Sequence, residues 1–170
     1  MRPFLFFLFL GTSLINLSAQ DGFSVPELTD DQKMEVLYQH VMSYATTGLA
    51  FAKTKGTSPR EYGSFMGKQF TAFWDPSGGF PVLVNQMMYI LAGMHPDNQM
   101  EILEQNDQMI RFRLKNVDLM FRQGPIFGVT YEELLETSYG IINEISQFMG
   151  AGFRHEQTAD GWYVVTMEKS

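Results

Sequence analysis

The sequence predicts an α+β domain in which about four helices pack on one face of a roughly four-stranded antiparallel sheet made of two hairpins. Three Ser or Thr residues precede a Glu or Gln by three positions, which is the capping-box spacing of a helix start. Two pairs of strand-like segments lie in the second half of the chain, and turn residues join each pair. Because an isolated hairpin is marginally stable in water, we expect both hairpins to share one sheet.

The first two helices begin at the capping boxes of Thr29 and Ser58. The first ends at Lys55 and Gly56, because a cation near the last turn and a glycine after it are signals of a helix end. Its apolar residues recur every three or four positions: Met34, Leu37, Val41, Tyr44, Ala45 and Gly48. The second helix has Pro59 at its first helical position, where the missing N–H costs nothing, and it ends before the turn at residues 75–79.

Two further helices are predicted, separated by the first hairpin. Residues 81–94 are apolar nearly all round, which predicts a buried helix. The third capping box, at Thr130, opens an amphipathic helix that ends before Gly150. Residues 116–129 show no pattern that assigns them a structure.

The strands are predicted from a change of period. Residues 99–105 and 108–115 form a hairpin through an Asn-Asp turn, and residues 153–158 and 162–169 form a second one through Ala-Asp-Gly. Alternation within 108–115 places apolar side chains on one face of the strand and basic ones on the other. The apolar set is Ile110, Phe112 and Leu114, and the basic set is Arg111, Arg113 and Lys115.

Residues 1–19 have the organisation of a secretory signal peptide. Arg2 is followed by an apolar run over 4–10 and by the small-residue exit Leu17-Ser18-Ala19, and the leader resembles those of bacterial exported proteins. The alternative, a buried N-terminal helix, would show polar residues on one face, and the run is too short for a membrane span. We expect export to the periplasm or beyond and cleavage near Ala19. Residues 20–170 would then form one soluble domain with no transmembrane span.

Composition excludes several classes of function. The chain has no cysteine, which removes disulfides, lipoprotein anchoring, thiol nucleophiles and thiolate metal sites. Its 12 basic and 19 acidic residues give a net charge of −7, and loss of Arg2 with the leader makes this −8. We therefore expect no nucleic-acid partner, because a chain this acidic is repelled by phosphate. About 150 residues suffice for one stable core.

A resemblance to known proteins covers residues 100–170. A hairpin, a loop, an amphipathic helix and a final hairpin containing GFRHEQTADGW follow one another there. This layout resembles the C-terminal half of L-2-amino-thiazoline-4-carboxylic acid hydrolase-like proteins and of 4-vinyl reductase small-ligand-binding domains. Both groups tend to have cysteines near the sheet, and this chain has none. The resemblance therefore implies a cavity between sheet and helices and transfers no catalytic residue.

No local motif predicts catalysis, a metal or a cofactor. His40, His95 and His155 lie too far apart for local metal-ligand spacing, and the last two are expected at the surface. Ser64 falls within a helix between Gly63 and Gly67, which instead predict close packing against a neighbouring helix. The catalytic alternative is a cofactor-free hydrolase in which His40 acts as general base with Tyr44, four positions away on the first helix.

Ligand-binding candidates are polar or aromatic residues in apolar surroundings. Asn85 and Gln86 interrupt the apolar helix, where they either bond to backbone or orient a ligand in a cavity. Arg111 and Arg113 either face solvent or anchor an acidic group. Trp74, beside a turn, is the candidate for an exposed aromatic contact. Methionine and phenylalanine are abundant, with 12 and 15 residues, which fits a core and also an adaptable pocket.

We hypothesise a non-enzymatic exported domain that binds a small apolar or amphipathic ligand, or a protein partner, through a cavity between helices and sheet. The reason is that the sequence has many methionine and phenylalanine residues and no recognisable set of catalytic residues. The hydrolase using His40 and Tyr44 is one alternative, and an envelope structural or assembly protein is another. The sequence assigns neither the ligand nor the oligomeric state.

Overall fold

The computed structural model describes residues 27–93 and 97–170, so the predicted signal peptide and His95 lie outside the described residues. The α+β prediction is confirmed. In chain order the elements are α1 (Asp30–Thr54), α2 (Pro59–Phe70), α3 (Gly79–Ala92), β1 (Gln99–Gln105), β2 (Met109–Lys115), α4 (Tyr131–Phe148), β3 (Ala151–Gln157) and β4 (Tyr163–Lys169). Short 3₁₀ turns occupy Thr71–Phe73, Pro76–Gly78 and Leu119–Phe121.

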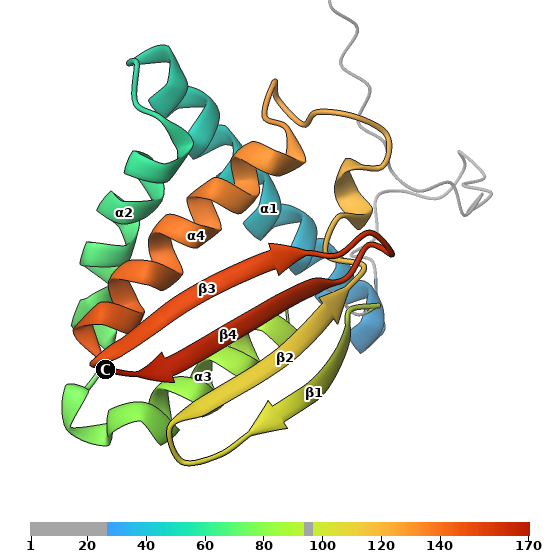
Figure 1. Ribbon diagram of the computed structural model, residues 1–170. Coiled ribbons are helices and arrows are strands. Elements are labelled where there is room, and N and C mark those ends of the chain that lie inside the picture. The colour runs from blue at the N-terminus through green and yellow to red at the C-terminus, as the bar shows by residue number, and fades with distance from the viewer. Residues whose placement is uncertain (1–26, 94–96) are drawn as a thin grey trace, which may run out of the picture.

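The sheet has the strand order β1-β2-β4-β3, with every neighbouring pair antiparallel. The two predicted hairpins are its outer pairs, and they join where β2 pairs with β4, for example at Phe112 and Val165. Figure 1 shows the helices together behind the sheet, whose other face is open. We call these the covered face and the open face.

The three helix starts form as predicted. Thr29, Ser58 and Thr130 each accept a hydrogen bond from the backbone N–H three residues on, and the Gln or Glu there accepts one from the cap backbone. Each box satisfies two N–H groups that a helix start leaves without partners. The start of α3 has no side-chain cap; its N-terminal end follows the Pro76–Gly78 turn instead.

The main core lies between the covered face and α3 and α4. Phe112 and Met167 of the sheet are fully buried there, as are Leu83 and Met87 of α3. The prediction that α3 is buried all round is wrong. Its other side is exposed, including Asn85, Gln86, Tyr89 and Ile90. One face of this helix is enough to cover its part of the sheet, so the remaining apolar residues stay at the surface.

A close contact between α2 and α4 confirms the interpretation of the α2 glycines. A Cβ on Gly63 would lie 2.0 Å from the Thr137 carbonyl oxygen, and one on Gly140 would lie 2.6 Å from the Arg60 carbonyl oxygen. Beside this contact the Ser64 hydroxyl donates a 2.5 Å hydrogen bond to Glu144. The backbones approach so closely because neither helix has a side chain at the crossing.

Residues 116–129 form a wrapped connection with its own small core. Phe121, in a 3₁₀ turn, packs with Met42 of α1 and Leu134 of α4. A bridge between Ile126 and Val129 closes the segment before α4. This connection ties α1 to the rest of the domain. Within the described residues, no helix is long and apolar enough to cross a membrane.

Candidate functional site

An apolar cavity lies between the covered face and the helices. It has a volume of about 60 Å³ and draws its walls from α3, β2, α4, β3, β4 and the residues after β2. Its lining is almost entirely hydrocarbon and aromatic ring: Leu91, Leu114, Val117, Leu135, Ser138, Tyr139, Ile142, Phe153, His155, Tyr163 and Val165. Space of this size holds a few water molecules or one small apolar group, and an apolar lining favours the latter.

Most of the polar groups of the cavity belong to a row of neighbouring rings. The His155 ring lies 5.0 Å from the Tyr139 ring and 5.9 Å from the Tyr163 ring, and it is nearly parallel to the second. Phe153 lies on the same face of β3, 6.0 Å from His155. Ser138, the preceding residue on α4, adds a hydroxyl to the lining. Three elements thus bring hydrogen-bonding groups to one apolar space.

The pKa values of His155 and Tyr163 are both shifted in the direction that keeps these two groups uncharged near neutral pH. Burial lowers the pKa of His155, Arg60 lowers it further, and only Glu136 acts in the opposite direction. Burial also raises the pKa of Tyr163 above its ordinary value. The cavity therefore has hydrogen-bonding capacity without a charge, which suits an apolar group that ends in a polar atom.

Charge is found just outside the cavity. The Arg60 guanidinium of α2 lies 3.8 Å from the centre of the Tyr139 ring and 3.7 Å from Glu136 of α4. Both members of this ion pair are about half exposed, at 53% and 50% of their side chains. Tyr139 therefore has the apolar cavity on one side and a cation on the other.

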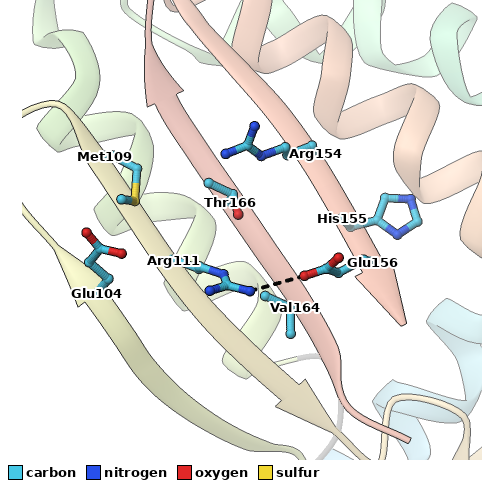
Figure 2. A pocket seen from close by; sticks show the side chains of 8 residues that line it. All are labelled: Glu104, Met109, Arg111, Arg154, His155, Glu156, Val164 and Thr166. Atoms are coloured by element: carbon cyan, nitrogen blue, oxygen red, sulfur yellow. Dashed lines mark hydrogen bonds and ion pairs between the residues drawn. The ribbon is translucent and has the colours of Figure 1, made fainter. Parts of the chain in front are cut away.

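The open face has a different hollow, a polar groove of about 480 Å³ (Figure 2). Its floor is β4, where Val164 and Thr166 are buried despite having no helix above them. An ion pair of 3.1 Å from Arg111 of β2 to Glu156 of β3 crosses over that strand. Glu104, Met109, Arg154 and His155 complete the lining, so His155 borders both hollows.

The two predicted arginines lie on the open face and are already paired. Arg113 hydrogen-bonds to Glu101 directly across from it on β1, at 2.5 Å, and its guanidinium lies 4.1 Å from the Trp162 ring centre. Arg111 pairs with Glu156. An anionic ligand would have to compete with carboxylates at both positions, so the groove offers no free cation.

The other predicted residues do not line the cavity. Trp74 is half-buried against the main core, and its neighbour Phe73 is the exposed ring, at 83%. Asn85 lines a separate open hollow between α3 and the first hairpin, and Gln86 faces solvent. His40 and Tyr44 are both exposed on α1. The structure therefore places His40 and Tyr44 away from the cavity, and it places the two amides away from any buried space for a ligand.

His155 is the functional candidate that the sequence interpretation missed. It was expected at the surface, and it is half-buried in the row of rings. One sequence signal points to it: the alternation that places Phe153 inward also places His155 inward, two positions later. The Tyr139 and Arg60 contacts have no comparable signal, because they come from helices distant in the chain.

Comparisons with known proteins add no relatives: no family model matches the chain, and neither the curated proteins nor the solved structures contain a significant match. The resemblance of residues 100–170 to the hydrolase-like and 4-vinyl reductase-like groups stays a prediction. Among the residues that the structure describes, no three metal-ligating side chains gather into a possible metal site.

Proposed function

We propose that this protein is a binding domain for a small apolar or amphipathic ligand, whose apolar end enters the cavity between α4 and the covered face. The observation that supports this most strongly is the lining. Eleven side chains from several elements line an apolar space, and burial lowers the pKa of its one imidazole, His155. Voids in a well-packed interior are few, and an apolar lining with a small number of polar groups is typical of small-molecule sites.

The size and surroundings of the cavity define the ligand class. A volume of about 60 Å³ is far below the roughly 300–1,000 Å³ of sites for drug-sized molecules, so only one small apolar group fits inside. The rest of the ligand lies outside, next to Arg60 and Tyr139. We therefore propose a ligand with a short aliphatic or aromatic group and a carboxylate head. Arg60 would attract the carboxylate, and the like charge of Glu136 would limit the affinity to a moderate value.

Native mass spectrometry of the protein, expressed from the full sequence and purified without denaturation, tests the proposal first. A co-purifying small molecule of reproducible mass supports it. Titration with hexanoate and with hexanol then separates tail from head. We expect saturable binding of both, with hexanoate two- to fivefold tighter, which is about what an exposed ion pair contributes. Arg60→Gln removes this preference.

A pair of variants on α4 localises the binding. Ser138→Leu fills the cavity from its lining, and we expect it to abolish hexanoate binding. Gln147→Leu makes a comparable change at an exposed position of the same helix and leaves binding unchanged. Equal binding by both variants would place the ligand elsewhere, and no saturable binding by the native protein would refute the proposal.

We also propose that residues 1–19 direct export and are removed after Ala19. The support is the order of regions in the leader: a positive start at Arg2, an apolar run and a small-residue exit at Ala19. N-terminal sequencing of the protein recovered from the periplasm or medium tests this. A first residue of Gln20 supports it, and an intact Met1 in the cytoplasmic fraction contradicts it.

A further inference from the structure

A stripe of large apolar side chains runs along α1, and no other described part of the chain covers it. Their exposed fractions range from 55% to 78%. Over Asp30–Leu37 every residue of the helix is exposed. Single exposed apolar residues are ordinary, but a continuous row of them marks an interaction surface. The α1 stripe consists of Met34, Leu37, Val41, Tyr44 and Phe51.

The spacing of the α1 stripe is that of a coiled-coil seam. Its intervals alternate strictly between three and four residues once Gly48 is included, which is a heptad repeat over the whole helix. The face by which α1 packs on its own domain is separate and consists of Met42, Thr46, Leu49 and Ala52. This helix therefore has two apolar faces, and the fold uses one of them.

We infer that α1 pairs with α1 of a second copy of this chain, antiparallel, about a two-fold axis that passes between positions 42 and 43. In this register Met34 faces the partner's Phe51, Val41 faces the partner's Tyr44, and Leu37 faces the partner's Gly48. A two-fold axis makes each of these contacts occur twice, so one stripe is complementary to itself. At Gly48 the Tyr62 side chain of the same chain covers the helix, with its hydroxyl 2.5 Å from where a Cβ would lie, so the partner's Leu37 packs on Tyr62 there.

Charge at the two ends of the stripe selects the antiparallel orientation. The same register places Asp30 opposite the partner's Lys55 at each end of the seam. Asp30 pairs with Lys33 at 2.9 Å within its own helix, yet its side chain stays 94% exposed, and Lys55 is exposed too, so both can reach a partner. Antiparallel pairing also places the positive end of each helix dipole beside the negative end of the other. A parallel pair would place Asp30 opposite Asp30 of the partner, with both copies of Asp31 beside them.

The area is sufficient for a dimer. A fully exposed Phe or Tyr presents about 150–250 Å² and the aliphatic side chains somewhat less, so the α1 stripe at its observed exposures offers roughly 600 Å² per copy. Two copies then bury about 1,200 Å², which is the lower end of specific protein interfaces. We expect a dimer of micromolar affinity, populated at high local concentration.

Sedimentation equilibrium of the protein expressed from the full sequence tests this inference with a matched pair of variants. Val41→Glu places a charge in the seam, and we expect it to raise the dimer dissociation constant at least about a hundredfold, because the charge would be buried without a partner. Val36→Glu makes the same change at the residue just before Leu37, off the seam, and leaves the constant within about threefold. The inference would be overturned if the native protein were still monomeric at about 100 μM, or if the two variants had equal effects.

The orientation of the two α1 helices can be tested by disulfide cross-linking. The chain has no cysteine of its own, so only the introduced cysteines can react. Met34→Cys and Phe51→Cys chains are prepared separately and then mixed under oxidation. Antiparallel pairing cross-links the mixture and neither variant alone, because residue 34 lies about 25 Å along the axis from its copy at 1.5 Å per residue. Cross-linking of either variant alone indicates a parallel pair and contradicts the register. The cavity lies outside this seam, so loss of dimerisation and loss of ligand binding are distinguishable.

Discussion

The two faces of the sheet bury the same strand by different means. On β4, Tyr163, Val165 and Met167 face the helices, while Val164 and Thr166 face outward, and all five are buried. The covered face achieves this with the apolar side chains of α3 and α4. The open face achieves it with long charged side chains that pair across the strands, as Arg111 does with Glu156.

The difference concerns which forces each face relies on. Apolar burial contributes about 25 cal/mol per Å² and depends little on salt, whereas exposed ion pairs contribute about 0–1 kcal/mol and are screened. The covered face therefore supplies stability, and the apolar cavity lies against it. The open face keeps the strands soluble, since paired charges on β1 and β3, the two edges, discourage pairing with another sheet.

Truncation at two adjacent residues of β2 is the strongest way to test this contrast. Phe112 is fully buried on the covered face, and we expect Phe112→Ala to lower the free energy of unfolding by about 3–5 kcal/mol. Arg113→Ala, on the open face, removes an ion pair and a contact with Trp162 and should cost less than about 1.5 kcal/mol. Urea denaturation measures both, and equal losses would show that the open face is a second core.

Glycine substitution gives the next largest effect. Gly63→Ala places a methyl group against the Thr137 backbone and must push α2 away from α4, which we expect to cost about 1–3 kcal/mol or more. Gly152→Ala is the matched control on the open face of β3, where the nearest atom to a new Cβ is 3.9 Å away. We expect its unfolding free energy to change by less than about 0.5 kcal/mol. Thermal unfolding followed by circular dichroism separates the two.

Much of the fold was predictable because its signals are local. A capping box places its two partners three residues apart, so Thr29, Ser58 and Thr130 each mark a helix start without knowledge of the rest of the chain. Hairpins are local in the same sense. The sheet then follows from the need to pair two hairpins, and its β2–β4 junction was the only long-range step.

The parts that were not predictable depend on what a helix packs against. The apolar composition of α3 indicated burial all round, yet the sheet accepts only the side that contains Leu83 and Met87. Asn85 and Gln86 were therefore interpreted as buried amides when they are exposed. The residues around the cavity were not predictable for the same reason, since the Arg60, Tyr139 and His155 contacts join α2, α4 and β3.

The smallest expected effect is a pH dependence at His155, which borders both faces. Its pKa lies below the ordinary 6.5 chiefly because of burial, so the folded protein binds fewer protons than the unfolded chain between the two values. Stability from this residue is complete above about pH 6.5 and is lost as the pH falls from there through the lower folded pKa. The carboxyl groups of Glu61 and Glu133, whose pKa values are lowered, act only at more acidic pH.

Urea denaturation between about pH 7.5 and pH 5.5 measures this slope, since that window spans the ordinary histidine pKa. We expect His155→Gln to flatten it. Glu136→Gln removes the group that favours protonated His155, so we expect a steeper loss in that variant. If the slope were unchanged in both, the imidazole would be in contact with water, and the row of rings would belong to the open face rather than to the core.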